Sequence, residues 1–167
     1  MNPSVLQLED LLFVRTRIDI DPEFEGDAGD FSFEGSKYRW ESRIGHRDHK
    51  PLEYWVGVEY SLHSDAEKRC PYVIDMKAVG FLSVRESVSE DKRDALVYEN
   101  GSALVFGAIR EMIANITGRS LFGTLLLPTA SFIGAHAEYV VREEKRKTAQ
   151  SKLPPTSGSD NPPSADV

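Results

Sequence analysis

The chain has little of several features that define whole classes of protein. Its 167 residues include a single cysteine, Cys70, so no disulfide can form within the chain, and a zinc site built from several cysteines is excluded. The longest apolar runs, such as residues 125–127, are far shorter than the roughly 20 residues that cross a bilayer. The first ten residues carry acids and no basic segment, so we expect no secretory signal, no membrane insertion and a cytoplasmic location.

Basic residues are also scarce, with 20 Lys and Arg against 27 Asp and Glu and a net charge of −7. An acidic chain without a basic stripe is a poor match for a phosphate backbone, so we expect no nucleic-acid partner.

Motifs that would indicate catalysis are missing as well. The sequence has no phosphate-binding Gly-rich loop and no Gly-x-Ser-x-Gly turn around a nucleophile. His46 and His49, with Asp48 between them, have a spacing known from metal sites, but they lie in a charged turn beside Arg47 and Lys50. We therefore expect solvated turn histidines, no metal, no cofactor and no enzyme activity. A small metal-dependent enzyme that uses these three residues is the alternative.

What the chain does have is an ordinary globular composition, with 40% hydrophobic and 28% charged residues. Residues 148–167 are the exception, because they are rich in proline and serine and hold little apolar surface to bury. We predict one folded domain over residues 1–147 and a disordered tail over residues 148–167.

Four segments before residue 90 alternate apolar and polar side chains with period two, the pattern of half-buried strands. Short connections between all but the first two segments favour an antiparallel meander. After Gly80 the alternation slips over residues 79–84, so we expect a bulge or bend there. The residues expected to share an apolar face are Leu12, Val14, Thr16, Ile18 and Ile20 in the first segment, Tyr38, Trp40, Ser42 and Ile44 in the second, Tyr54, Val56, Val58, Tyr60 and Leu62 in the third, and Tyr72, Ile74, Met76 and Ala78 in the fourth.

The period then changes to that of an amphipathic helix, which we expect from Ser102, as its N-cap, to Thr117, with Gly118 ending it. A second helix is expected over residues 131–147. Strands followed by helices predict an α+β fold, a four-stranded antiparallel sheet followed by two helices.

Two helices offer limited cover for a four-stranded sheet, and the third strand carries aromatic residues on both faces. Trp55 is expected opposite Tyr54 and Tyr60. Some apolar surface should therefore remain for another chain.

The stretch from Tyr72 to Phe132 resembles the SecB family of export chaperones. The segment PYVIDMKAVGFLSVRE looks like the last strand of that family, with a glycine near a bend followed by two large apolar residues. The segment LVFGAIREMIANITGRSLFGTLLLPTASF looks like its helix with an Ala-Arg-Glu-like core, its Arg-Gly-x-Phe turn, its Leu-rich run, a proline and a phenylalanine. Gly107 and Ala108 replace the usual Pro-Tyr before that core, and the Gly-Arg order is inverted at residues 118–119.

This resemblance implies an ATP-independent holdase that binds unfolded or pre-secretory polypeptides and delivers them to SecA. It also implies a homotetramer, a dimer of dimers, with no cofactor and no catalysis. A dedicated antitoxin chaperone of a toxin–antitoxin system is the alternative within the same family.

The resemblance assigns roles to three groups of residues in this sequence. The face for clients and sister subunits is expected at Tyr72, Ile74, Met76, Leu121 and Phe122. The candidate contacts with SecA are Val73 and Asp75. Helix packing and the oligomer interface are expected at Leu104, Ile109, Met112 and Ile116.

Overall fold

The computed structural model describes residues 4–151 and confirms the α+β class. Residues up to His136 form one compact unit, and those from Ala137 on form a second. The elements are β1 (Leu6–Ile20), the short 3₁₀ turn η1 (Ala28–Asp30), β2 (Lys37–Arg47), β3 (Lys50–His63), β4 (Tyr72–Val84), α1 (Glu90–Leu96), the π-helical turn η2 (Val97–Gly101), α2 (Ser102–Thr117) and α3 (Ala135–Ser151). From residue 152 on, the predicted tail lies outside the described residues.

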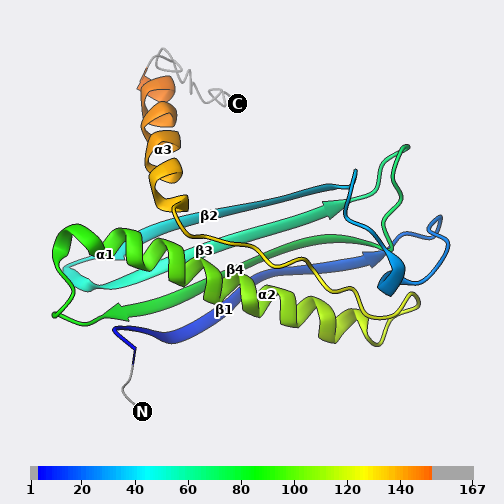
Figure 1. Ribbon diagram of the computed structural model, residues 1–167, viewed down its shortest axis with the longest axis horizontal. Helices are drawn as coiled ribbons and strands as arrows, with labels where there is room; N and C mark the ends of the chain where they lie inside the picture. The colour runs from blue at the N-terminus through cyan, green and yellow to red at the C-terminus, as the bar shows by residue number, and fades with distance from the viewer. Residues whose placement is uncertain (1–3, 152–167) are drawn as a thin grey trace, which may run out of the picture. The chain divides into compact units, whose positions relative to one another are not determined.

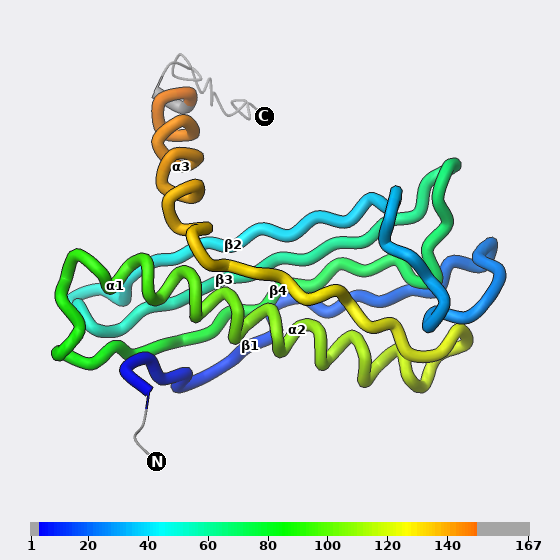
Figure 2. Tube along the Cα trace, viewed as in Figure 1, coloured from blue at the N-terminus to red at the C-terminus, as the bar shows by residue number. Residues whose placement is uncertain are grey.

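The four strands form one antiparallel sheet in the order β1-β4-β3-β2 (Figures 1 and 2). The predicted meander is therefore correct for β2, β3 and β4, but β1 pairs with β4 instead of β2. The reason lies in the connection 21–36, which is long enough to carry the chain across the sheet from one edge to the other.

Strand β1 carries two irregularities, one near residue 9 and one at Val14, and between them it alternates out of phase with the prediction. Thr16, Ile18 and Ile20 keep the predicted phase, opposite Met76, Ile74 and Tyr72 of β4. Leu11 and Phe13 pack against the core. Leu12 lies opposite Val79 on the other side of the sheet. Leu12 and Val14, predicted to face the core, are 49% and 61% exposed.

Strand β4, in contrast, alternates between buried and half-buried residues along its whole length. The bulge predicted after Gly80 is absent from this strand, and the register breaks lie in β1 instead. Gly80 faces the helix, and a Cβ atom there would lie 2.8 Å from Cγ2 of Val105. The glycine thus serves a close approach between strand and helix instead of a bend.

The predicted helix 102–117 is confirmed as α2, with both ends as expected. Ser102 is not its N-cap, however, because α1 and η2 lead into it without a break, and the residue before it already has helical φ and ψ. The second helix begins at Ala135, four residues later than predicted, and runs on to Ser151.

One face of the sheet is packed against the helical run, and the other carries no helix of the unit that ends at His136. Helix α2 contacts β1, β3 and β4, and η2 contacts β2, β3 and β4. The inward side of the helical run buries Val97, Val105, Phe106, Ile109 and Ile113. We call the packed side the helix face and the other side the helix-free face.

Substitution of alanine for two glycines on the helical run should change the stability of the protein in opposite directions. A Cβ atom on Gly101 would lie 2.9 Å from Cγ2 of Val56, a branched and stiff side chain, whereas Gly107 has nothing within 4 Å. We expect Gly101→Ala to lower the free energy of unfolding by about 1–3 kcal/mol through overpacking. Gly107→Ala, the matched control, should raise it by about 0.5–1 kcal/mol through helix propensity alone. Urea unfolding of both variants measures this, and equal effects would contradict the helix–sheet packing.

Candidate polypeptide-binding surface

The segment 118–134, which follows α2, lies extended over the helix face and is fixed there by side-chain hydrogen bonds. The Leu125 N–H donates to Thr117 Oγ1 over 2.9 Å, and Arg110 Nε donates to the Leu127 carbonyl over 3.0 Å. The Tyr72 hydroxyl donates to the Gly123 carbonyl over 2.7 Å. Because α2 and β4 hold its backbone, the segment presents its side chains in a defined order.

Those side chains alternate sharply between core and solvent. Leu125 and Leu127 are 1% and 2% exposed, and Leu126 between them is 69% exposed. Phe132 is buried, and its ring lies 4.9 Å from that of Trp40 on β2. The segment thus covers part of the sheet and at the same time turns apolar residues outward.

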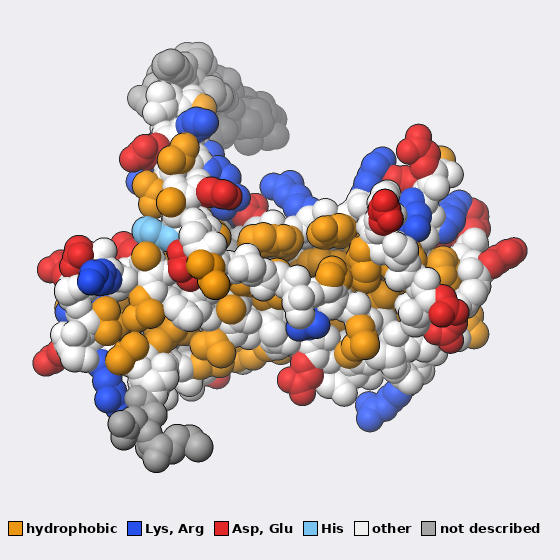
Figure 3. Space-filling view, in the orientation of Figure 1, with side chains coloured by type: hydrophobic (Ala, Val, Ile, Leu, Met, Phe, Trp, Pro, Cys, Tyr) orange, Lys and Arg blue, Asp and Glu red, His pale blue; other side chains and the backbone are white. Residues whose placement is uncertain are grey.

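The outward residues, together with one on α2, form what we call the helix-side apolar surface. Its members are Leu104, Leu121, Leu126 and Ile133, which are 46%, 74%, 69% and 89% exposed. Figure 3 shows apolar side chains gathered along the region where Figure 1 draws α2 and the following segment. Large apolar residues exposed in such number on one side of a domain indicate an interaction site.

A row of aromatic rings flanks the segment where it turns back. The ring of Phe122 lies 5.2 Å from Phe24 and 6.1 Å from Tyr72. The Ala28 N–H donates to the Phe122 carbonyl over 2.7 Å, which ties the connection 21–36 to this turn. The acidic connection, to which the sequence assigned no role, therefore supports the border of the apolar surface.

The strand residues predicted to touch clients lie elsewhere. Tyr72, Ile74 and Met76 are 0% exposed and form the core beneath α2. A client or a sister subunit cannot touch them without opening the core, so this part of the prediction is corrected to a packing role. Leu121 is exposed and Phe122 half-buried, so both are accessible, and their contact with clients stays a prediction.

The four helix residues divide in the same way. Ile109 is 0% exposed and faces the sheet, whereas Leu104 points outward. Met112 and Ile116 are half-buried along the side of α2. A shared interface role thus fits Leu104 best, with Met112 and Ile116 at its margin.

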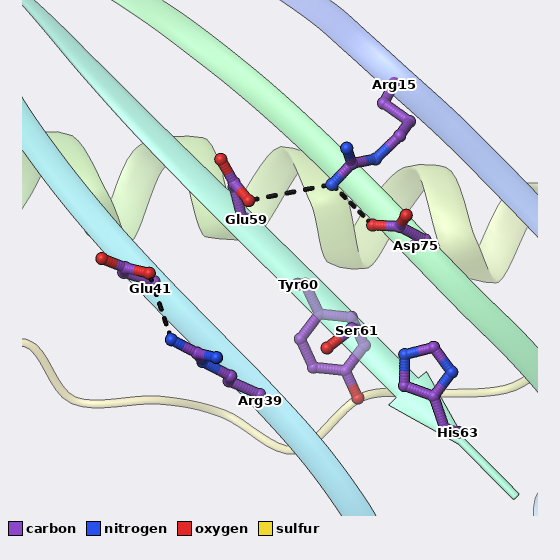
Figure 4. A pocket seen from close by; sticks show the side chains of 8 residues that line it. All are labelled: Arg15, Arg39, Glu41, Glu59, Tyr60, Ser61, His63 and Asp75. Atoms are coloured by element: carbon purple, nitrogen blue, oxygen red, sulfur yellow. Dashed lines mark hydrogen bonds and ion pairs between the residues drawn. The ribbon is translucent and has the colours of Figure 1, made fainter. Parts of the chain in front are cut away.

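Val73 and Asp75 lie half-buried on the helix-free face, where charged side chains neutralise one another (Figure 4). Asp75 pairs with Arg15 over 2.7 Å, and Glu59 accepts a hydrogen bond from Lys77 over 2.5 Å. That bond is the main reason why the pKa of Glu59 lies below its usual value.

The two histidines with metal-like spacing lie in different surroundings. His46 Nε2 lies 3.4 Å from Asp94 of α1, and its ring lies 4.3 Å from Tyr54. His49 stands in the β2–β3 turn with a φ of 62°. Within residues 4–151, no three His, Cys, Asp or Glu side chains gather closely enough to hold a metal ion.

Two further features concern function classes that the sequence raised. Cys70 is buried, and burial raises the pKa of its thiol, which disfavours a reactive thiolate. Among the described residues, no helix is long and apolar enough to span a bilayer.

Comparison with known proteins gives a likeness of fold. No family model matches the chain, and no curated protein matches it in sequence. One similar structure is Rv1957, a SecB-like chaperone of Mycobacterium tuberculosis, in complex with a ChAD peptide from the Rv1956 HigA1 antitoxin. It superposes on this chain with a TM-score of 0.55 and 15% sequence identity, and the match covers 75% of this chain and 88% of that one. A protein of unknown function from Streptococcus agalactiae superposes with a TM-score of 0.44 and 11% identity over 74% of this chain and 96% of that one. The chain therefore has a SecB-like fold, as its Tyr72–Phe132 stretch predicts.

Proposed function

We propose that this protein is an ATP-independent holdase that binds unfolded or pre-secretory polypeptides through the helix-side apolar surface. The observation that carries the proposal is the row of outward apolar residues on a segment whose backbone is fixed to α2 and β4. The SecB-like fold supports it, because the similar M. tuberculosis protein is a chaperone bound to a peptide.

Apolar contact suits a partner without a fixed sequence. Burial of apolar area contributes about 25 cal/mol per Å² and has no directional requirement, so many client sequences bind equally well. Such holding is passive and needs no nucleotide, since a ligand that binds only the unfolded state shifts the equilibrium by mass action. The net charge of −7 opposes non-specific aggregation through the exposed apolar residues.

The homotetramer is part of the same proposal. Leu104 on the outer side of α2, with the half-buried Met112 and Ile116 beside it, offers apolar area to a second subunit. A dimer of dimers in the cytoplasm would have a mass near four times 18.7 kDa, which sedimentation measures directly.

A dedicated antitoxin chaperone is the second candidate, favoured by the antitoxin peptide held by the M. tuberculosis neighbour. The two functions differ in selectivity. A dedicated chaperone binds one antitoxin and ignores unrelated unfolded proteins, whereas a general holdase binds several of them with similar affinity. Competition between unrelated unfolded proteins for the chain separates the two.

Removal of the outward leucines tests the holdase proposal. Leu121→Ser combined with Leu126→Ser should weaken binding of an unfolded client at least tenfold, because each leucine that a client fully buries is worth about 1.5–3 kcal/mol. Light scattering of thermally unfolding citrate synthase, with and without the chain, measures the loss of suppression.

The matched control is Leu12→Ser combined with Val14→Ser, two exposed apolar residues on β1. It should suppress aggregation as the unaltered chain does. Equal suppression by the chain and its Leu121/Leu126 variant would overturn the assignment of the surface.

Delivery to SecA rests on the resemblance of Val73 and Asp75 to the family's contact positions. Asp75→Lys should weaken SecA binding about tenfold or more, because it adds a base beside Arg15 and Lys77 and removes an acid. Biolayer interferometry with immobilised SecA measures this, and Glu86→Lys, in the exposed turn after β4, gives the same charge change as a control. Normal SecA binding by the Asp75→Lys variant would remove these residues from the contact.

A further inference from the structure

The helix-free side of β2 carries a row of bases that the acidic composition conceals. Lys37, Arg39, Arg43 and Arg47 point to this side, with Glu41 as the one acid on that side of the strand. Composition predicts no basic stripe in this chain, yet the register of an edge strand assembles one. We call these four bases the β2 basic row.

The bases reach further into solvent than the acid between them. The side chains of Lys37 and Arg39 are 73% and 79% exposed, whereas that of Glu41 is 18% exposed. Arg39 and Arg43 both approach the Glu41 carboxylate, over 3.4 Å and 3.2 Å. One carboxylate thus serves two guanidinium groups, and this group of three retains a positive charge.

The acids on the inner strands are already engaged with other bases. Figure 4 shows Arg15 of β1 between Glu59 of β3 and Asp75 of β4. Lys77 also pairs with Glu59. These acids therefore compensate the inner strands. At the ends of the row, Lys37 pairs with Asp65 and Arg47 with Glu53, each over 2.9 Å, so the surplus of positive charge is that of Arg39 and Arg43 around Glu41.

An aromatic ring separates Arg47 from the other three bases of the row. The ring of Trp55 lies over Gly45, where a Cβ atom would come within 2.4 Å of it. Gly45 is the residue of β2 between Arg43 and Arg47 on this side, and the Trp55 ring takes the space that a side chain there would fill. A partner segment can lie flat along the strand here.

We propose that the β2 basic row binds an acidic, extended segment of a partner protein. Alternate residues of a strand stand about 7 Å apart, so carboxylates on one side of an extended partner match the spacing of the row. Exposed ion pairs contribute only about 0–1 kcal/mol, so Arg39 and Arg43 exchange Glu41 for a partner carboxylate at little cost. Nucleic acid fits less well, because it extends its phosphates beyond the row, over a chain whose net charge of −7 repels a long polyanion.

This inference does not rest on the proposed holding of polypeptides. The row lies on the helix-free face, whereas the helix-side apolar surface lies on the opposite side of the same sheet. A negative result for one of the two surfaces therefore does not contradict the proposal for the other.

Binding of a fluorescein-labelled peptide of twelve glutamates, followed by fluorescence anisotropy in low salt, tests the proposal. The full chain should bind it, and Arg39→Gln combined with Arg43→Gln should raise its Kd by about tenfold or more, because two charge-assisted pairs are lost. Lys92→Gln combined with Arg119→Gln, two exposed bases outside the row, makes the same charge change. This control should alter the Kd by less than about twofold.

Three results would overturn the proposal. One is an equal rise in the Kd of the glutamate peptide for the Arg39/Arg43 variant and the control, which would show that only net charge matters. Another is tighter binding of a lysine peptide of the same length. The last is tighter binding of a DNA duplex that depends on Arg39 and Arg43, which would assign the row to nucleic acid.

Discussion

The structure depends on a mismatch between the width of one helix and the width of the four-stranded sheet that it covers. A helix with its side chains is about 10 Å across, while the outer strands of a four-stranded sheet lie about 14 Å apart. Helix α2 reaches β1, β3 and β4, so the core side of β2 needs other cover. The turn η2 covers one part of β2, and Phe132 of the segment 118–134 covers another by packing against Trp40. An extended segment alternates its side chains, so one that buries Leu125 and Leu127 must expose Leu126. The apolar surface is thus a consequence of how the core is closed.

Much of the fold follows from local pattern, and the parts that do not are non-local. Helix α2 could be predicted because its apolar stripe and its end are written in consecutive residues. The place of β1 could not, since strand order depends on where the 21–36 connection crosses. Its phase could not either, because two irregularities in β1 shift Leu11 and Phe13 inward in place of Leu12 and Val14. Gly80 was misjudged for the same reason, as its contact is with Val105 on a distant helix.

The candidate site shows a similar division. Leu121 and Phe122 could be found from the resemblance, and both lie at the surface. Tyr72, Ile74 and Met76 form an apolar stripe whether a strand faces its own core or another chain, and the pattern alone does not distinguish the two. The exposed Ile133 was missed, because only the packing of the segment 118–134 reveals that its side chain points outward. The period-two pattern of β2 does place Arg39 and Arg43 opposite Trp40, but the ion pairs that decide the charge of that side are non-local. The alternation of residues 125–127 is invisible in sequence, since all three are leucine.

The sheet therefore separates two surfaces of different chemistry, an apolar one beside the helix and a charged one on the face without it. The claim that matters most is that unfolded polypeptides occupy the first. Methyl NMR of the full chain, labelled at Leu, Ile and Val and titrated with an unfolded protein such as reduced, carboxymethylated α-lactalbumin, locates the contact directly. We expect the signals of Leu121, Leu126 and Ile133 to shift or broaden while those of Leu12 and Val79 stay unchanged. Perturbation confined to the helix-free face, or none at saturating client, would contradict it.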